Sequence, residues 1–354
     1  MSETPNAEKK ENYFLRTFCV FIIFCIIFVH YEPCYQLFGM NAYEFIEGVG
    51  RFAMPMFFMI SGYFLYSADG HSERSLKKKT LRILVLLIIM KVLYIVLDLI
   101  YYSCGVISYD ELMQGVITMN WSNKHIWFVV FLFVVYLFHW ALYRFHVNFK
   151  YSMIFGIICL AMLLFTADIC AWASIPEIAG ISTYNLGQIF YCFEGFFFFP
   201  LGYILHKYKS KTDGWNTWIL LVIAIIGAAL SVWEVINFYP MTGVTYSSLY
   251  FGSVIIAIPF FILTFRIPEN RLRCKTLEYL GRNALPWMYA FYMAIMFFIK
   301  FIVMDNIDAP LEILDLIGMI VSAILDMILA YGMFKLMTRL FGKKLVRSAD
   351  FKPE

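Results

Sequence analysis

One long apolar stretch near the start of the chain carries two side chains that can take part in chemistry. It runs from Phe14 to Glu32, FLRTFCVFIIFCIIFVHYE, with Arg16 near its beginning and His30 near its end. An imidazole gains or loses a proton near neutral pH, and a guanidinium stays positively charged and holds anionic groups. The pair therefore indicates proton transfer beside a developing negative charge, provided that the fold surrounds both side chains suitably.

This stretch is long enough to cross a membrane as one helix, which needs roughly 20 apolar residues at about 1.5 Å each. Arg16 and His30 lie about 21 Å apart along such a helix and on nearly the same face. Polar groups that face lipid are costly, so this face is expected to line a bundle interior or a wet cavity. In the alternative interpretation, Arg16 extends to one membrane surface and His30 lies among headgroups.

The second apolar run, GVGRFAMPMFFMISGYFLYS, places a cation at its entrance and small residues further along. Arg51 stands at the entrance, and Pro55 is expected to kink the helix one turn further in. Ser61 and Gly62 are small enough to let a neighbouring helix approach closely. The run thus combines a second candidate for holding negative charge with a predicted helix–helix contact.

Several other ionisable side chains fall inside or at the ends of apolar runs. For the charged ones, a structural pair between helices is the favoured interpretation, and a direct role with a substrate is the alternative. Two histidines near run ends, His139 and His206, are expected at the membrane interface. The charged residues inside the runs are Lys91, Asp98, Glu194, Glu234, Lys300 and Asp326.

Composition indicates a polytopic membrane protein. The 354 residues are 62% hydrophobic and 19% aromatic, and only 15% are charged, which no soluble domain of this length requires. The net charge of +3 is too small to indicate nucleic-acid binding. The eight cysteines show neither a CxxC motif nor Cys/His metal spacing, so no metal site is expected.

The chain divides into about ten apolar runs, which predicts an all-α bundle of about ten transmembrane helices. We expect a leader over residues 1–13, a membrane domain over 14–340 and a tail over 341–354, without an appended soluble domain. The runs are approximately 14–31, 49–67, 81–102, 125–143, 150–172, 186–206, 216–236, 247–265, 284–304 and 313–338.

The distribution of basic residues predicts the orientation of this bundle in the membrane. Every basic cluster falls on the same side of a ten-helix arrangement, and the loops on the opposite side carry mainly Asp and Glu. Since positive charge favours the cytoplasmic side, both termini are predicted to be cytoplasmic, and His30, Arg51 and His125 then lie toward the outer face. The clusters lie at residues 9–16, 74–82, 144–150, 207–211, 266–282 and 335–347.

Four motifs in order along the chain resemble those of the integral-membrane acyltransferase family called acyltransferase-3. The string from Arg51 to Leu65, RFAMPMFFMISGYFL, is similar to the second helix of that family. Lys79 and Arg82 match its K-x-x-R motif, and residues 125–128, HIWF, resemble its HLWF-like sequence. Residues 281–285, GRNAL, resemble the entry to its ninth helix. The resemblance covers essentially the whole chain, and the family also has ten spans.

One position departs from the family pattern. The family usually carries an arginine ten intervening residues before the first-helix histidine, and that position is Cys19 here. Arg16 stands about 4.5 Å deeper on nearly the same helical face. Arg16 therefore either takes over the arginine's role or serves as an anchor among headgroups.

The resemblance implies transfer of an acyl group, usually acetyl from acetyl-CoA, to a hydroxyl of an envelope glycan or small carbohydrate. His30 would act as general base or as an acyl-carrying nucleophile, with Glu32 orienting its imidazole. Arg51 or Arg16 would stabilise the oxyanion of the tetrahedral intermediate. The remaining expected roles are donor binding by Arg16, Lys79 and Arg82, and acceptor binding by His125, Trp127 and Ser61.

Two other functions stay open from the sequence. A transporter or flippase for a small polar metabolite would show repeated halves and interrupted midplane helices, and Pro55, Pro200 and Pro259 make interrupted helices conceivable. A structural or sensory membrane subunit is the third alternative. For each of the three, the expected location is the plasma or inner membrane, with the chain crossing several times.

Overall fold

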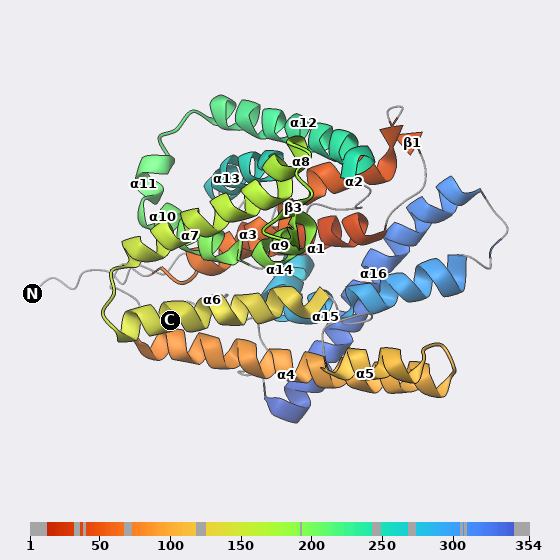
Figure 1. The fold of residues 1–354 in the computed structure, drawn as a ribbon. Helices are drawn as coiled ribbons and strands as arrows, with labels where there is room; N and C mark the ends of the chain where they lie inside the picture. Colours follow the sequence, from red (N-terminus) through yellow and green to blue (C-terminus); the bar gives the residue numbers. More distant parts are fainter. Residues whose placement is uncertain are drawn as a thin grey trace, which may run out of the picture.

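The chain forms a bundle of helices in the computed structural model (Figure 1). The structure describes residues 13–31, 36–37, 40–66, 73–117, 125–191, 193–242, 249–267, 274–304, 307 and 310–342. Two short antiparallel hairpins, β1–β2 and β3–β4, accompany the helices in this part of the chain.

The first half of the chain contributes the elements up to α8. In chain order they are α1 (Tyr13–Tyr31), β1 (Gln36–Leu37), β2 (Met40–Asn41), α2 (Ala42–Gly50), α3 (Ala53–Tyr63), α4 (Glu73–Ser103), α5 (Tyr109–Ile117), α6 (Trp127–Arg144), α7 (Phe149–Leu164), the π-helical segment η2 (Phe165–Ile169) and α8 (Cys170–Trp172).

The second half contributes the rest. In chain order these are β3 (Glu177–Ile178), β4 (Ile181–Ser182), α9 (Thr183–Tyr191), α10 (Gly195–Lys207), α11 (Lys209–Thr212), α12 (Thr217–Thr242), α13 (Phe251–Arg266), α14 (Lys275–Asn283), α15 (Leu285–Phe297), the π-helical segment η3 (Phe298–Val303) and α16 (Leu311–Phe341).

Seven helical stretches among the described residues are long and apolar enough to cross a membrane. The predicted all-α membrane bundle is therefore confirmed. Three other predicted runs, 49–67, 247–265 and 284–304, appear as the shorter helices α3, α13 and α15. The seven stretches are Phe14–Tyr31, Ser75–Ser103, Trp127–Arg144, Phe149–Trp172, Asn185–Lys207, Thr217–Asn237 and Glu312–Phe341.

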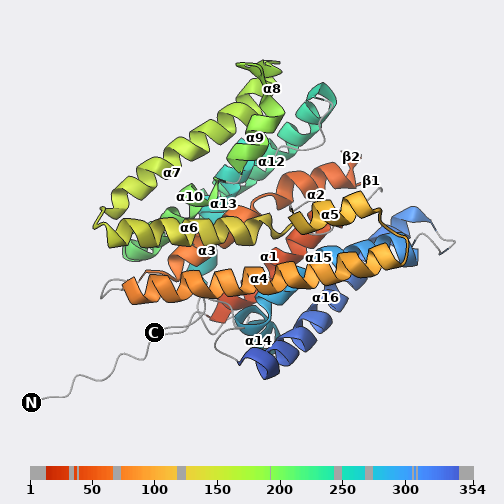
Figure 2. The same ribbon diagram turned by 60° about the horizontal axis from the view of Figure 1, so that its bottom comes forward.

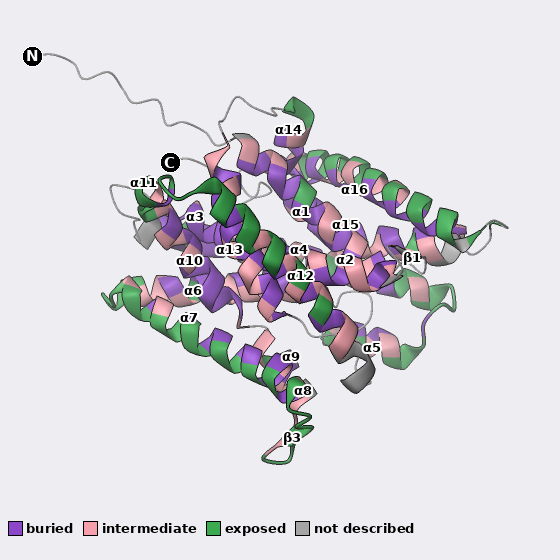
Figure 3. Cartoon of the chain, turned by 90° about the horizontal axis from the view of Figure 1, so that it is seen from above, coloured by how far each residue is buried: buried purple, intermediate pink, exposed green. Residues whose placement is uncertain are grey.

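The outer helices turn large apolar side chains away from the bundle. Green, exposed stripes run along α7, α12 and α16, whereas α3 and α10 are mostly purple (Figure 3). On α12, for example, Ile225 is 66% exposed and Trp218 is 75% exposed. A soluble protein would not tolerate such continuous apolar faces, but lipid covers them at no cost.

The second apolar run is interrupted one turn before Pro55. The chain turns at Arg51 and Phe52, so α2 ends at Gly50 and α3 begins at Ala53. Pro55 lies in the first turn of α3, where its missing N–H breaks no intrahelical hydrogen bond. Because a proline ring clashes with the carbonyl of the residue four positions earlier, the interruption expected from Pro55 is found one turn before it, at Arg51.

Close contact between α3 and α10 depends on two glycines. A Cβ atom at Gly62 would lie 1.8 Å from the backbone oxygen of Phe199, and one at Gly202 would lie 2.0 Å from that of Met59. Neither distance is sterically possible, so the two backbones touch directly at both glycines. The close helix approach expected from Ser61 and Gly62 is therefore found, with α10 as the partner.

Two side chains cap the C-terminal end of α3. Lys79 at the start of α4 donates from Nζ to the carbonyl oxygen of Phe64 at 2.9 Å, and His206 at the end of α10 donates from Nδ1 to that of Tyr63 at 2.7 Å. Both satisfy carbonyls that the helix leaves unpaired. We call this side of the bundle, where α4 begins and α3 and α10 end, the basic end.

His139 is buried between helices near the end of α6. Its side chain is 3% exposed, its Nδ1 donates to the carbonyl oxygen of Val135 at 2.7 Å, and its Nε2 accepts from the hydroxyl of Ser152 at 2.7 Å. The sequence suggested an interface because His139 is near a run end. The structure shows a buried hydrogen bond that joins α6 to α7.

Candidate functional site

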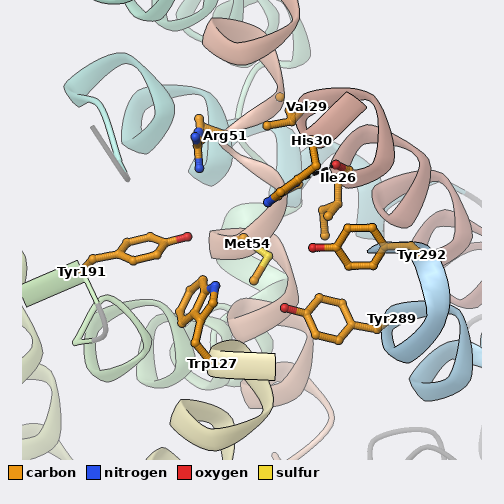
Figure 4. Close-up of a pocket in the computed structure, with 11 residues that line it drawn as sticks. Ile26, Val29, His30, Arg51, Met54, Trp127, Tyr191, Tyr289 and Tyr292 are labelled. Atoms are coloured by element: carbon orange, nitrogen blue, oxygen red, sulfur yellow. Dashed lines mark hydrogen bonds between the residues drawn. The ribbon is translucent and has the colours of Figure 1, made fainter. Parts of the chain in front are cut away.

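A polar pocket lies where five segments meet: the end of α1, the bend between α2 and α3, the start of α6, the end of α9, and α15 (Figure 4). We call this side of the bundle the site end, because it is opposite the basic end along α3 and α4. The polar and aromatic residues of its lining are His30, Arg51, Trp127, Tyr191, Tyr289 and Tyr292.

The imidazole of His30 is fixed by its own helix. Its Nδ1 lies 2.9 Å from the carbonyl oxygen of Ile26, four residues earlier, and a carbonyl can only accept. Nδ1 therefore carries the proton, and Nε2 of the neutral ring has the lone pair. In Figure 4 the ring extends from α1 toward the centre of the pocket, so His30 is oriented as a base or a nucleophile.

Tyrosine side chains surround the space in front of His30. The hydroxyls of Tyr191 and Tyr292 point into the pocket from opposite sides (Figure 4). The Tyr292 ring meets the imidazole edge-on at a centroid distance of 5.5 Å, and Trp127 packs against Tyr191 at 4.3 Å. Aromatic walls with a few convergent hydroxyls suit a ligand that has apolar faces and polar edges.

Arg51 brings a guanidinium to the same pocket. Its Nε donates to Oε1 of Glu47 at 2.5 Å, and its Nη2 forms an ion pair with the same carboxylate. Glu47 lies one turn earlier on α2 and is 1% exposed. A guanidinium has five N–H donors in a planar fork, and this ion pair orients Arg51 in the wall of the pocket.

His125 lies one layer behind the pocket and does not line it. It is 3% exposed, and its Nε2 lies 3.2 Å from both the Tyr94 hydroxyl and the carbonyl oxygen of Ala290. Its own carbonyl oxygen accepts a 2.5 Å hydrogen bond from the hydroxyl of Tyr289. The sequence placed His125 at the mouth of its run, but the structure makes it a support for pocket residues.

A second, apolar pocket adjoins the first on the side toward the basic end. We call it the apolar chamber. The space between its atoms is about 570 Å³, against about 340 Å³ in the polar pocket, and Tyr289 lines both. Helix α4 forms one wall and runs beside α6 in both views (Figures 1 and 2). Further lining residues include Phe57, Ser61, Ile83, Leu86, Met90 and Phe128.

The two basic residues of the K-x-x-R motif, Lys79 and Arg82, lie on α4 just before the residues that line the chamber, on the side toward the basic end. Lys79 precedes the lining residues Ile83, Leu86 and Met90 at helical spacings of four, seven and eleven positions, hence on one face. Arg82 is next to Ile83, half-buried and about 12 Å along the axis from Met90. Anionic groups bound at Arg82 would therefore lie at the basic end of the chamber.

Arg16 is buried inside the bundle, far from His30. It is 2% exposed, and its Nη1 lies 3.9 Å from Oε1 of Glu278 on α14. A Cβ at Gly281 would lie 1.9 Å from the Arg16 carbonyl oxygen, so α14 packs tightly on this turn. The alternative of a headgroup anchor is therefore excluded. Arg16 does not line the polar pocket, so oxyanion stabilisation there is left to Arg51.

The remaining expected site residues divide as follows. Trp127 lines the polar pocket, whereas Ser61 lines the apolar chamber. Glu32 lies outside the described residues. Among the described residues, no three His, Cys, Asp or Glu side chains gather as metal ligands do.

Sequence reasoning missed the three tyrosines of the pocket. Tyr191, Tyr289 and Tyr292 lie within aromatic-rich apolar runs, where tyrosine is common at membrane interfaces. Two buried acids, Glu194 and Asp326, have no hydrogen-bond partner among the described residues, although the positive charge of Arg51 acts on Glu194. Lys300, another charged residue of an apolar run, donates from Nζ to the carbonyl oxygen of Tyr31 at 2.6 Å. Tyr31 is the residue that follows His30.

Comparison with known proteins agrees with the resemblance seen in the motifs. The family model of acyltransferase-3, described as an acyltransferase domain, matches residues 13–332. No match was found among curated proteins or among solved structures. Because the family model covers nearly the whole helical bundle, including both pockets, the chain belongs to the acyltransferase-3 family of membrane acyltransferases.

Proposed function

We propose that this membrane acyltransferase moves an acyl group, typically acetyl, from acyl-CoA to a hydroxyl of an envelope glycan or small carbohydrate. The observation that carries the proposal is the imidazole of His30, fixed through Nδ1 and directed into a pocket with Arg51 and tyrosine hydroxyls. Acyl transfer to oxygen needs a base, a group that stabilises an oxyanion, and a site for the alcohol. This pocket offers all three.

In the proposed reaction, Nε2 of His30 takes the proton of the acceptor hydroxyl. The acceptor oxygen forms a bond to the thioester carbonyl carbon, the carbon–sulfur bond breaks, and the proton passes to the sulfur of the departing CoA. In a two-step route, Nε2 first forms a bond to the acyl carbon while the carbon–sulfur bond breaks and CoA leaves as the thiolate. The acceptor oxygen then displaces the imidazole from the acyl carbon, and the hydroxyl proton passes to the thiolate. Both routes consume one alcohol and release one thiol.

Arg51 is placed to stabilise the negative oxygen that develops on the carbonyl. Its ion pair with Glu47 holds the guanidinium in position before the reaction, which is what makes electrostatic stabilisation effective. Trp127 and Tyr191 would pack against the ring faces of a carbohydrate, and the tyrosine hydroxyls would meet its polar edges.

The donor would enter from the basic end. Coenzyme A is cytoplasmic and anionic, so its phosphates fit Arg82 and Lys79, and its pantetheine arm fits the apolar chamber that leads to the polar pocket. The basic end would then face the cytoplasm and the site end the outer side. The protein would lie in the plasma or inner membrane.

The purified protein in lipid vesicles, given acetyl-CoA labelled in the acetyl group, tests the proposal. Release of CoA thiol together with label on an added carbohydrate is the expected result. Protein-dependent thiol release that is equal in the His30→Ala variant would contradict the proposed site. Uptake of label into the vesicles without thioester cleavage would instead favour the transporter alternative.

Replacing Arg82 by glutamine should raise the KM for acetyl-CoA without changing the amount of inserted protein. A hydrogen bond to a charged group contributes about 1.5–3 kcal/mol, so roughly ten- to hundredfold is expected. The matched control is Lys78→Gln, which removes one positive charge from an exposed position of the same helix. Equal KM values for the two variants would indicate that Arg82 does not bind the donor and only helps to set the orientation of the chain in the membrane.

Thiol labelling of single cysteines should establish the orientation. In a cysteine-depleted background, Lys78→Cys should react with a membrane-impermeant reagent only after the membrane is opened, because the basic end is predicted to be cytoplasmic. Asp110→Cys, exposed in the first turn of α5, should react in intact cells. The reverse pattern would overturn the predicted orientation.

A further inference from the structure

Tyr289 is the residue that the two pockets share. Its ring lies between the polar pocket, which contains His30, and the apolar chamber, which extends toward the basic end. The side chain is 5% exposed although it borders both spaces. It therefore fills the boundary between them rather than lining an open passage.

Several contacts hold this ring in place. Its hydroxyl donates to the carbonyl oxygen of His125 at 2.5 Å. Its ring packs at 5.3 Å from that of Phe128 and at 5.6 Å from that of Tyr292. These contacts come from α6 and from the next turn of α15, so the ring is fixed from two sides.

His125 is itself held by the backbone and side chain of neighbouring helices. Its Nε2 interacts with the Tyr94 hydroxyl and the Ala290 carbonyl, and Tyr94 also donates to Ala290 at 2.6 Å. This network ties the first turn before α6 to α4 and α15. The His125 carbonyl oxygen that accepts from Tyr289 is therefore held firmly in place. Holding it there is a structural role for the buried His125 behind the pocket.

The chemistry of transfer makes such a boundary useful. Water is itself a hydroxyl acceptor: attack by water on a thioester breaks the carbon–sulfur bond and gives a free carboxylic acid and CoA thiol, without a transferred group. An enzyme that uses an alcohol must therefore keep water from the thioester until the alcohol is bound. A bulky aromatic ring between a polar pocket and an apolar chamber serves that purpose.

We propose that Tyr289 is a positioning residue that partitions the donor chamber from the acceptor pocket, and that its hydrogen bond to His125 keeps the partition closed until the alcohol is bound. The proposal rests on the proposed function for its purpose, but the partition itself is testable without turnover. Truncating Tyr289 joins the two spaces, admits water to the bound thioester and shifts the enzyme from transfer toward hydrolysis.

The partition is tested by labelling a cysteine placed in the chamber. Leu86→Cys lies on the α4 wall, and a membrane-impermeant thiol reagent is added on the side from which Asp110→Cys reacts in the same cysteine-depleted background. The expected result is no labelling of Leu86→Cys alone and a gain of labelling when Tyr289→Ala is added. Tyr289→Phe, which keeps the ring and loses the hydrogen bond, should give an intermediate gain.

Tyr136→Phe is the matched control, because it removes another buried tyrosine hydroxyl, the one that donates to the Ser61 carbonyl at 3.3 Å. Equal labelling with and without Tyr289→Ala, or the same gain in Tyr136→Phe, would overturn the partition. If Tyr289→Ala does not fold, the comparison of Tyr289→Phe with Tyr136→Phe decides.

Thiol release from acetyl-CoA without an added alcohol gives the second measurement. It should rise severalfold in Tyr289→Ala relative to the parent protein, while label transferred per thiol released falls. Thioester cleavage absent from every variant would reject the proposed function, whereas the labelling result would still decide whether Tyr289 separates the pockets.

Discussion

Acyl transfer should fall by about 10² to 10⁴ when His30 is replaced by alanine, because the pocket then has no base at the reacting oxygen. Loss of an acyl-carrying nucleophile would cost more. The variant should still insert and fold, since His30 is half-buried on a polar pocket and its Nδ1 hydrogen bond is to its own helix. Label transfer from acetyl-CoA, measured at saturating donor, reports the effect on kcat.

A second histidine provides the control for this variant. His139→Ala also removes a buried imidazole whose Nδ1 donates to a carbonyl four residues earlier, but it lies away from both pockets. It should lower stability and leave kcat of the folded fraction near that of the parent protein. Full turnover in His30→Ala together with an inactive His125→Ala would show that the chemical centre had been assigned to the wrong histidine.

Replacing Gly62 by alanine should prevent normal packing of α3 against α10. The added Cβ would lie 1.8 Å from the backbone oxygen of Phe199 and 2.8 Å from its carbonyl carbon, and backbone cannot move aside as a flexible side chain can. Overpacking of a well-packed interior typically costs about 1–3 kcal/mol. Separating these helices would also displace Arg51 and Ser61, which border the two pockets on the same segment.

The comparison variant is Gly332→Ala on α16, where an added Cβ would meet nothing within 4 Å. Both variants exchange glycine for alanine inside a helix, so the helix-propensity gain is similar and only the steric term differs. We expect a lower melting temperature in detergent and less monodisperse protein for Gly62→Ala, and neither change for Gly332→Ala. Similar behaviour of the two variants would contradict the direct backbone contact.

Much of the helical framework can be predicted from the sequence because lipid imposes a simple rule. Each crossing must satisfy its backbone within a helix and present apolar side chains, so apolar runs are visible in composition alone. The first run predicted over 14–31 is found as Tyr13–Tyr31. Arg51 at the entrance of the second run and His30 at the end of the first can both be singled out by residue type and position alone, and both line the polar pocket.

The pocket itself depends on contacts between distant segments, which local patterns do not specify. Tyr289 and Tyr292 look like any tyrosine of a membrane protein until α15 is packed beside α1 and α6. Pro55 indicates that the second run is interrupted, but the run alone does not show that the break separates two helices at Arg51, four residues before the proline. The sequence predicts His125 at the outer mouth of its run, because that run alone does not show which neighbouring helices bury it.

The apolar lining of the chamber has an electrical consequence. The described residues that line it carry no carboxylate, amine or guanidinium group, so the chamber offers no site for an ion between the basic end and the polar pocket. Moving one elementary charge through a membrane voltage costs about 2.3 kcal/mol per 100 mV. An acyl group carries no charge and crosses this layer without that cost. Delivery of the acyl group would then proceed at the same rate in energised and de-energised membranes, and each turnover would leave the ion gradients intact.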